Sequence, residues 1–531
     1  MSVIWYKTWS DLFDNKIRTL LAVLSIAAGV FAIGVTFGMT DQLLSGLDAS
    51  HRASTPAHIS IYLTDYIDRA KVDRLKNIEG VKAIELSNHL SPIQYKRFPN
   101  QVWQNGEIII RENYETQIYD QLNLETGQWP QRRQITVERL SSQFYNIGIN
   151  DTVIFKVGGR TRERQINGIT QDKLSLPPLF GGNAVFFMHN KDGEIFGVPK
   201  DQYNQLLIQV TPYSPELAKN VATTIKDRLS QEQANVAFSI FKDPQKHWGR
   251  STVKGLNLVL QIMAVSSLAA SVVLVFNTVT AFVTQQTNQI GILKAIGGAQ
   301  GKIVQVYLAL ILVYGLLALF IALPLGAWLS FVVTQYMLSL FNVDYTTFRL
   351  STTTLLWQSL AALTVPILAG LWPILKGTAI TVREAIASYG LGGNYKSNHL
   401  DTFALWFGQT FLSGPYALAL SNTFRHKQRL WLTQGVLILA GAMFLVILSL
   451  ASSVSVTLDN IFFDHRYDFV VGFSDDERVE RLIGPAQQHP GVKSVEVWTS
   501  YTGTILKENQ DRRKAGVGIE LVGIPNGSQS F

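Results

Sequence analysis

The chain has 531 residues, of which 47% are hydrophobic and 16% are charged. That length exceeds one ordinary domain, and the composition lies between a soluble enzyme and an all-membrane protein, so we expect membrane spans together with at least one soluble domain. The net charge is +7 and there is no cysteine, which excludes disulfides, Cys-ligated zinc or iron–sulfur sites, and thiol catalysis.

The first apolar run, residues 19–40, is the first predicted membrane span. It has 22 residues without a charge, and at about 1.5 Å per residue such a helix crosses a hydrocarbon layer of roughly 30 Å. A cleaved secretory signal is the alternative, but the run is longer than a usual signal core and no small-residue cleavage site precedes Asp41. Residues 1–18 then form an N-terminal segment on one side of the membrane.

Residues 41–255 separate this run from the other apolar runs and are predicted to form an α+β domain. Short β-rich runs such as 58–63 and 152–157 are bounded by turn residues, and residues 215–229 have helical spacing after Ser214. The two ends of the interval are expected to continue the neighbouring spans as a stalk, with amphipathic linkers as the alternative. The nine histidines of the chain are scattered, and neither H-E-x-x-H nor G-x-S-x-G occurs, so we predict no catalytic residue, no cofactor and no metal site.

Four further apolar runs without charged residues are predicted as spans two to five. One Arg or Asp at the centre of a span raises the free energy of membrane insertion by about 2.5 to 3.5 kcal/mol, so runs without charge are typical of spans. Buried helices of a soluble core are the weaker alternative. The runs are residues 256–283, 304–340, 354–375 and 430–450. The run 304–340 is too long for one straight span and contains Pro324, so we expect tilt, a kink or an extension beyond the bilayer.

Lysine and arginine placement orients these spans, because cytoplasmic loops carry an excess of both residues. The basic residues near the span ends are Lys7, Lys16, Arg18, Lys294, Lys302, Lys376, Arg383, Arg425, Lys427 and Arg429. They predict that residues 1–18, the connection 284–303 and the linker 376–429 are cytoplasmic. Alternation then places residues 41–255 and 452–531 outside, in a multi-pass protein of the plasma (inner) membrane with a cytoplasmic N-terminus.

The connection 284–303 contains a predicted short amphipathic helix. Ile290, Leu293 and Ile296 recur near helical spacing with Lys294 beside them, and the Gly297-Gly298 pair is expected to end the helix. A helix lying in the membrane interface is the alternative interpretation.

An internal repeat relates the two ends of the chain. EGVKAIEL at 79–86 matches PGVKSVEV at 490–497, so that Gly80 corresponds to Gly491, 491 − 80 = 411 positions later. The same offset maps Lys16 and Arg18 onto Lys427 and Arg429 before spans one and five, although a shared strand–turn pattern would also produce short matches. Residues 452–531 are therefore expected to begin a second outer domain, in a protein that continues beyond this sequence to on the order of 800 residues.

The connection between spans two and three resembles the E-I-G-[I/L]-[R/L]-[R/K]-A-[I/L]-G-A signature of FtsX-like ABC transporter permeases, which include MacB-type and lipoprotein-releasing permeases. The matching residues are Ile290, Gly291, Leu293, Lys294, Ala295, Ile296 and Gly297, and Gln289 stands where the family commonly has Glu. The end of span four is similar as well, with Gly370, Pro373, Lys376, Ala379, Arg383 and Ala385 at motif positions. The acidic residue that the family often has early in span three is absent.

The resemblance implies a fold and a function. The fold is an α-helical transmembrane bundle, with five spans in this chain, a MacB-like α+β extracytoplasmic domain between spans one and two, and the start of a second such domain at the C-terminus. The function is that of a permease subunit, without a catalytic site, which couples ATP hydrolysis by a separate ATPase to extracytoplasmic work on a lipid, lipoprotein or peptide. The implied ATPase contacts are Gln289, Ile290, Gly291, Leu293, Lys294, Ala295, Ile296 and Gly297, with Ile290 and Leu293 as anchors and Lys294 at the rim.

The implied partners are a cytoplasmic ABC ATPase dimer and membrane lipid, with an extracytoplasmic adaptor as an optional further partner and no nucleic acid. The nearest phosphate-loop sequence, GGAQGKI, has Ile296 in place of the first required Gly and Ile303 in place of Ser or Thr. Two alternatives stay open: an FtsX-like regulator of an extracytoplasmic hydrolase, and a membrane-anchored sensor that needs no ATPase.

Overall fold

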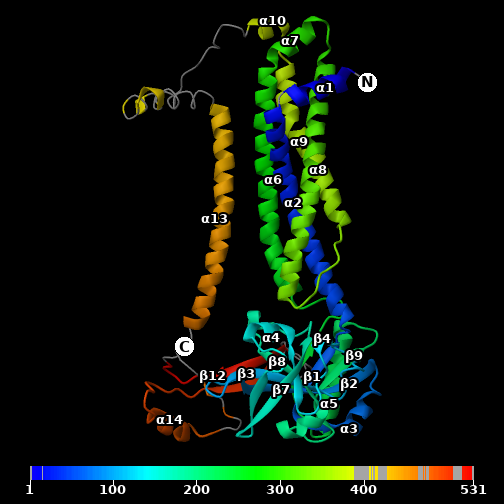
Figure 1. Cartoon of the computed structure of the whole chain (residues 1–531), viewed down its shortest axis with the longest axis vertical. Helices are drawn as coiled ribbons and strands as arrows, with labels where there is room; N and C mark the ends of the chain where they lie inside the picture. The colour runs from blue at the N-terminus through cyan, green and yellow to red at the C-terminus, as the bar shows by residue number, and fades with distance from the viewer. Residues whose placement is uncertain are drawn as a thin grey trace. The chain divides into compact units, whose positions relative to one another are not determined.

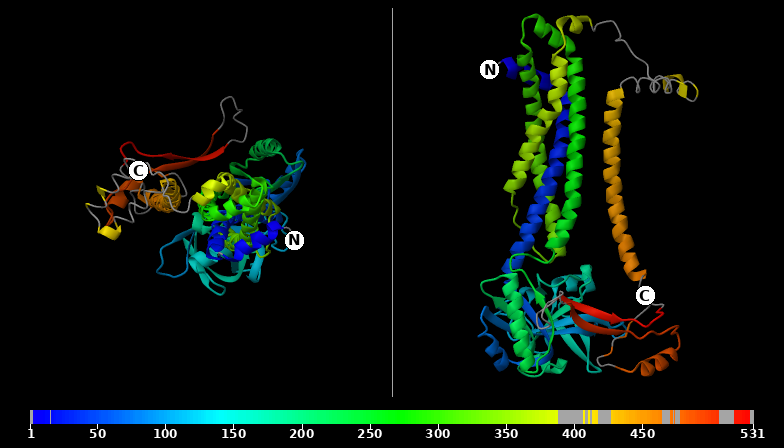
Figure 2. Two further views of the ribbon diagram at one scale, coloured as in Figure 1. Left: turned by 90° about the horizontal axis from the view of Figure 1, so that it is seen from above. Right: turned by 180° about the vertical axis from the view of Figure 1, so that it is seen from behind.

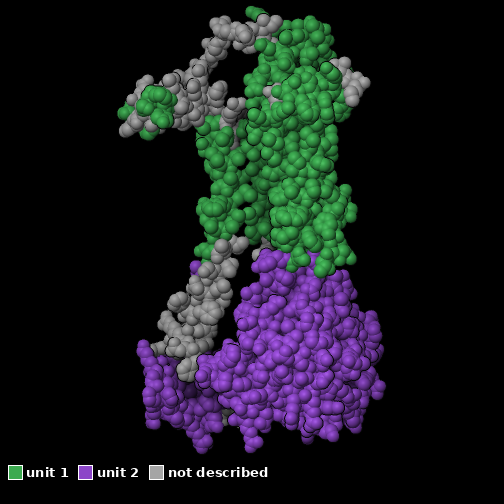
Figure 3. Space-filling model, viewed as in Figure 1, with its two compact units in different colours: residues 1–43, 252–335, 346–454 green, residues 44–251, 336–345, 455–531 purple. Residues whose placement is uncertain are grey.

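The computed structural model divides into two units by its internal contacts (Figure 3). One, the helical unit, comprises residues 1–43, 252–335 and 346–454, and the other, the sheet unit, comprises residues 44–251, 336–345 and 455–531. The structure describes residues 3–14, 16–387, 406–407, 410, 413–416, 427–463, 470–471, 473, 477–505 and 517–528. Most of the predicted linker 376–429 therefore lies outside the described residues.

Four long apolar helices form the centre of the helical unit, and each is long and apolar enough to cross a membrane. They are α2 (Lys16–Ala53), α6 (Arg250–Gln285), α8 (Gln300–Leu340) and α9 (Thr352–Thr378). Figures 1 and 2 show them packed side by side. The first four predicted spans lie within these helices, which confirms the four apolar segments.

Close contacts between small residues hold these helices together. At two glycines the neighbouring helix is so close that no larger residue would fit. A Cβ atom added to Gly34 of α2 would lie 1.7 Å from Nε2 of Gln358, and one added to Gly315 of α8 would lie 2.3 Å from the carbonyl oxygen of Ala362. Helices in a membrane associate through such close approach and through polar contacts, since lipid provides no hydrophobic drive for their association. Accordingly, Gln358 is buried and donates a hydrogen bond of 3.4 Å to the carbonyl of Val30.

Three shorter helices complete this part of the chain. The helix α1 (Val3–Asp14) precedes α2, α7 (Thr287–Ala295) connects α6 to α8, and α10 (Val382–Ala387) follows α9. The α1 helix is tied to α2 where the Thr19 hydroxyl donates to the carbonyl of Leu12 at 3.1 Å.

A further helix, α13 (Lys427–Phe463), contains the apolar stretch Thr433–Ser449. The predicted fifth span, residues 430–450, lies within this helix and stays a prediction. The described part of residues 452–531 contains α14 (Val479–Gln487) and a hairpin of β11 (Thr499–Ile505) and β12 (Val517–Gly523). The second outer domain stays a prediction as well.

The two halves of the predicted repeat form the same local turn. Gly80 and Gly491 both have a left-handed backbone, with φ of 88° and 95°. In each copy the amide of the next residue donates to a carbonyl three positions earlier, from Val81 to Ile78 and from Val492 to His489. Glycine suits this conformation because it carries no Cβ.

The sheet unit contains an α+β domain that extends from β1 to β10. Its strands are β1 (Ile59–Asp68), β2 (Val81–Lys96), β3 (Gln104–Arg111), β4 (Asn123–Gly127), β5 (Gln134–Glu138), β6 (Thr152–Val157), β7 (Arg160–Gln171), β8 (Ala184–His189), β9 (Gln202–Val210) and β10 (Val236–Phe241). They pair in the order β10-β1-β9-β2-β3-β8-β5-β7-β4, with β6 against β2 and β7. The pairs β3–β8 and β5–β7 are parallel, and the other pairs are antiparallel.

The two largest apolar clusters of this domain lie against its sheet. The helix α5 (Pro215–Gln231) packs Val221 and Ile225 into the core of the β1–β9 region, and the second core surrounds Phe155 and Phe186. Ser214 caps α5, since its hydroxyl accepts a hydrogen bond of 3.0 Å from the amide of Leu217. The predicted α+β class and this helix start are confirmed.

Candidate functional site

The helix α7 is the connection that the sequence singles out, and a glycine motif ends it. The amide of Gly297 donates to the carbonyl of Lys294 at 3.0 Å, and that of Gly298 donates to the carbonyl of Leu293 at 2.8 Å. Gly297 has φ of 93°, so these bonds form a Schellman motif that satisfies two carbonyl groups at the helix end. The predicted Gly-Gly stop is confirmed, and it fixes the length of α7.

The predicted contact residues occupy two opposite faces of α7. Ile290 and Gly291 are buried, Leu293 and Lys294 are partly buried, and Gln289, Ala295, Ile296 and Gly297 are exposed. Ile290 is 0% exposed because its side chain lies in the apolar core of the helical unit. In this structure it packs inside its own chain, and a role for Ile290 as an anchor for a partner stays a prediction.

The exposed face of α7 carries two large apolar side chains. Ile292 is 61% exposed and Ile296 is 77% exposed. The sequence pattern did not distinguish Ile292 from its neighbours, because apolar residues occur on every side of this nine-residue helix. A buried isoleucine on one face and exposed isoleucines on the other give α7 an inner side for packing and an outer side for contact.

Polar contacts hold α7 against neighbouring segments. The Lys294 ammonium donates a hydrogen bond of 2.7 Å to the carbonyl of Ile380, just before α10. The Gln289 side-chain oxygen accepts a bond of 3.0 Å from Lys7 of α1, and Lys7 also pairs with Asp11 at 2.9 Å. Lys294 therefore has a positioning contact inside the chain, whereas the sequence reading placed it at the rim of an interface.

The α10 helix, which packs against α7, begins with a capping box. The Thr381 amide and hydroxyl both donate to the Glu384 carboxylate at 2.9 Å, and the Glu384 amide donates to the Thr381 hydroxyl at 3.3 Å. The hydrogen bond from the Thr381 amide lowers the pKa of the Glu384 carboxyl. The T-x-x-E spacing is a known helix-start signal, so this cap is visible in the sequence.

A second cluster lies in the sheet unit, where residues 336–345 contact the α+β domain. We call it the Asn342 latch, and it comprises Glu138, Arg139, Gln171, Asp172, Asn342 and Asp344. The Asn342 amide donates at 2.6 Å to both the Glu138 carboxylate and the Asp172 carbonyl, and the Asn342 side-chain oxygen accepts from Arg139 at 2.8 Å. Arg139 and Gln171 also donate to the Asp344 carboxylate, at 2.8 and 2.9 Å.

The latch buries two carboxyl groups. Burial raises the pKa of Glu138 to about 7 and also raises the pKa of the Asp172 carboxyl. Sequence reasoning missed this cluster because its hydrogen bonds join residues up to 205 positions apart. The only local signal is an Asn with a left-handed backbone, φ of 61°, and that is visible only in the structure.

The ends of α2 and α6 meet in the sheet unit. Asp48 accepts hydrogen bonds from the His247 amide at 3.2 Å and from the Arg250 guanidinium. His51 contacts the Asp243 carbonyl at 2.8 Å, and burial lowers the pKa of both His51 and His247. Among the residues that the structure describes, no group of His, Asp or Glu has the arrangement of a metal site.

Comparisons with known proteins found one family model and one curated relative that match this chain. Residues 261–382, which include α7, match the family model described as "FtsX-like permease C-terminal". The chain is 22% identical over 334 residues to "Probable export ATP-binding/permease protein MacB" of Pseudomonas entomophila (strain L48), covering 56% of this chain and 47% of that protein. The chain thus spans about half the length of this curated relative.

Three solved structures are also similar. An extracellular domain of the noncanonic ABC-type transporter YknZ from Gram-positive bacteria is 12% identical, with a TM-score of 0.24, covering 34% of this chain and 97% of that one. The periplasmic region of MacB from Actinobacillus actinomycetemcomitans is 10% identical, with a TM-score of 0.25 and coverages of 38% and 94%. A domain of a permease protein from Porphyromonas gingivalis is 11% identical, with a TM-score of 0.23 and coverages of 34% and 85%.

Proposed function

We propose that this chain, a distant homologue of MacB with an FtsX-like permease C-terminal domain at residues 261–382, is the membrane-spanning permease subunit of an ABC transporter. A separate cytoplasmic ATPase dimer binds the outer face of α7. Closure of the ATPase on ATP displaces α7 and the long helices on either side of it. That displacement does work on a lipid, lipoprotein or peptide outside the membrane.

The observation that supports this proposal best is the exposed apolar pair on α7. Ile292 and Ile296 are largely exposed on a helix whose other face is buried in the bundle. Apolar side chains at the centre of an interface contribute much of its binding energy. Because the Schellman motif and the Lys294 contact fix α7 on its own chain, a force on this face reaches the helical bundle instead of bending a loop.

The assignment of ATP hydrolysis to another subunit is part of this proposal, and one feature of the sequence supports it. Within these 531 residues, the segment nearest to a phosphate-binding loop has Ile296 and Ile303 at two positions that the motif reserves for Gly and Ser or Thr. The MacB relative is named as both an ATP-binding protein and a permease. In this proposal, the ATP-binding function belongs to a partner of this chain.

The proposal is tested by placing a charge on the outer face of α7. Ile292→Asp and Ile296→Asp should leave expression and membrane insertion near normal, because both side chains are already exposed. An unpaired charge buried at an interface costs several kcal/mol, so co-purification of an ABC ATPase and its stimulation by the permease should fall about a hundredfold or more. The readouts are the ATPase retained on the tagged, co-expressed permease and its rate of phosphate release.

The matched control is Gln300→Asp, which places the same charge at an exposed position four residues beyond Ile296. It should keep the bound ATPase if the contact is specific to the outer face of α7. Retention of full ATPase binding and stimulation by Ile296→Asp would exclude α7 as the coupling helix and favour its role as an interfacial anchor.

A further inference from the structure

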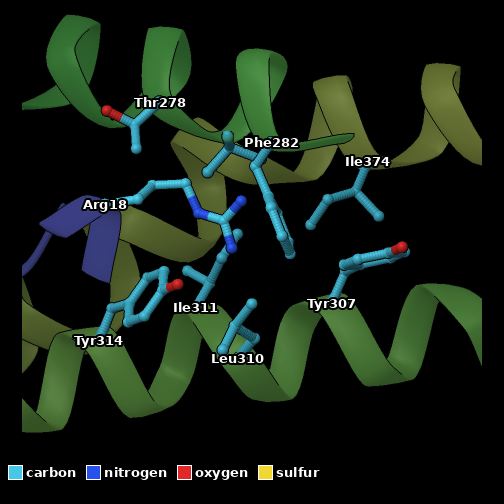
Figure 4. A pocket seen from close by; sticks show the side chains of 9 residues that line it. Arg18, Thr278, Phe282, Tyr307, Leu310, Ile311, Tyr314 and Ile374 are labelled. Atoms are coloured by element: carbon cyan, nitrogen blue, oxygen red, sulfur yellow. The ribbon is translucent and has the colours of Figure 1, made fainter. Parts of the chain in front are cut away.

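A small hollow between four helices of the helical unit surrounds an arginine. Arg18 extends into it from α2, Thr278 and Phe282 line it from α6, Tyr307 and Tyr314 line it from α8, and Ile374 lines it from α9. Figure 4 shows the guanidinium group pointing into the middle of these side chains. The hollow has room for about one water-sized group.

The guanidinium group of Arg18 has unused hydrogen-bond donors. Its Nε and Nη2 atoms are buried without a hydrogen-bond partner among the described residues, and the nearest side-chain oxygen in the lining is the hydroxyl of Tyr314. The group lies 4.1 Å from the centre of the Phe282 ring, which is a cation–π contact. The nearby acidic side chain of Asp11 is paired with Lys7 instead.

The ring contact does not compensate for burial of this charge. A cation–π contact contributes about 0.5 to 2 kcal/mol, whereas each buried donor left without a hydrogen bond costs about 1 to 3 kcal/mol, and the partly buried Arg18 has two such donors. Charged side chains within membrane proteins are accordingly paired or serve a function. An anion that accepts hydrogen bonds from Nε and Nη2 would remove this imbalance.

The surroundings of Arg18 favour an anion that belongs to a lipid. Arg18 lies immediately before the apolar run that begins at Thr19, and the neighbouring helix α1 exposes Trp5 and Trp9, as helices at a membrane interface do. Of the residues in the most apolar stretch of α6, 17% are buried, and at the hollow Thr278 is partly exposed, so this helix has a face open to lipid. Leu310 and Ile311 make the rest of the lining apolar, which does not suit a fully hydrated free anion.

We propose that this hollow, the Arg18 pocket, binds the phosphate group of an anionic phospholipid. One phosphate oxygen enters the hollow and accepts from the guanidinium group, whose planar donors match phosphate geometry. The glycerol and acyl chains stay outside, against the lipid-facing side of α6. Basic pockets between transmembrane helices are a recurrent site for anionic head groups.

The test measures phosphatidylglycerol retained by the full chain after purification from mixed phosphatidylglycerol and phosphatidylcholine nanodiscs, by native mass spectrometry. Arg18→Gln should lower retained phosphatidylglycerol about tenfold, the value of about one charge-assisted hydrogen bond. Thr278→Trp should lower it similarly, because the ring fills the hollow while every charge stays in place. This second variant decides the question if Arg18→Gln fails to insert.

Lys16→Gln is the matched control, because Lys16 is exposed on the same helix two residues earlier and does not line the hollow. An equal loss for Lys16→Gln and Arg18→Gln would show general charge attraction and would overturn the proposal. Competition by inorganic phosphate or glycerol 3-phosphate at millimolar concentration would overturn the lipid as the source of the anion. No loss in Thr278→Trp would show that the hollow is not the site.

Discussion

Single buried carboxyl groups give the sheet unit its clearest electrostatic feature. Glu138 is 1% exposed, and its carboxylate accepts from the Ser141 amide at 2.7 Å, the Ser141 hydroxyl at 3.1 Å and the Asn342 amide at 2.6 Å. These donors satisfy the group and cap α4 (Arg139–Tyr145). They do not fully offset the loss of hydration, so the pKa stays raised to about 7.

This raised pKa predicts a pH dependence of stability. Between pH 4.5, the ordinary pKa of the group, and about 7, the folded chain holds a proton on Glu138 that the unfolded chain has lost. The free energy of unfolding should therefore fall as pH rises through this window and level off above it, by about 3 kcal/mol at most from this group. Thermal unfolding of the full chain at pH 5 and pH 8, for wild type and Glu138→Gln, measures it.

The contribution of Glu138 must be measured as the difference between wild type and Glu138→Gln, because His247 changes the free energy of unfolding with pH in the opposite direction. Burial lowers the pKa of His247 from 6.5 to about 4, so its contribution to stability is lost as pH falls through that range. Glu138→Gln keeps an oxygen for the Ser141 donors and lacks the titration of Glu138, so the stability of the variant minus that of wild type should rise between pH 5 and about 7. Identical pH profiles for the two proteins would show that Glu138 stays ionised in the folded chain.

At the scale of elements, one face of α7 is buried in the helical unit and the other is exposed, so substitutions on the two faces should affect stability differently. Ile290→Ala should cost about 2 to 5 kcal/mol of stability, because it leaves a cavity in the bundle core. Ile296→Ala should stay within about 0.5 kcal/mol, since that side chain is mostly exposed. The shift of the unfolding midpoint in detergent separates the two variants.

ATPase binding should show the reverse order for variants that remain folded. Ile296→Ala should weaken the ATPase complex, whereas Ile290→Ala acts on the fold and affects the complex only to the extent that α7 loosens. An equal and small loss of stability for both variants would mean that Ile290 is not held in the core under solution conditions.

The sequence predicts those elements whose signals are local. Long uncharged runs give the four apolar helices, Ser214 gives the start of α5, and the Gly297-Gly298 pair gives the end of α7. The inward face of α7 could not be predicted, because apolar residues surround a helix of only nine residues.

Contacts between distant parts of the chain escaped prediction for a similar reason. Asn342 joins Glu138 and Asp172, which are 204 and 170 positions away, and no spacing rule connects them. As a basic residue before the first span, Arg18 helped to predict the orientation of the chain. The burial of its Nε and Nη2 atoms without hydrogen bonds could not be predicted, because it depends on how α6, α8 and α9 pack around the side chain.

At the scale of the molecule, continuous helices belong to both units. The helix α2 contributes residues 44–53 to the sheet unit, and α8 contributes residues 336–340. An α-helix of 38 residues is about 57 Å long, so only part of α2 can lie within a hydrocarbon layer of roughly 30 Å. The chain is therefore helical where α2 and α8 pass from one unit to the other.

The last prediction is the orientation of the chain, which the absence of cysteine makes simple to test. Basic residues near α7 and the N-terminus predict that this side is cytoplasmic, and the α+β domain is then extracytoplasmic. Single cysteines at Glu115 and Ser230, both exposed in the sheet unit, should react with a membrane-impermeant thiol reagent in intact cells, or in spheroplasts if an outer membrane is present.

A single cysteine at Ala299, exposed in the connection between α7 and α8, should react only after the membrane is permeabilised. The cysteine-free parent chain is the control for background labelling. Lys294 and Lys302 flank this connection, and moving both across the membrane during insertion would oppose the charge bias that sets topology. Labelling of Ala299→Cys but not Ser230→Cys in intact cells would invert the orientation, and an ATPase in the cytoplasm could then no longer reach Ile292 and Ile296.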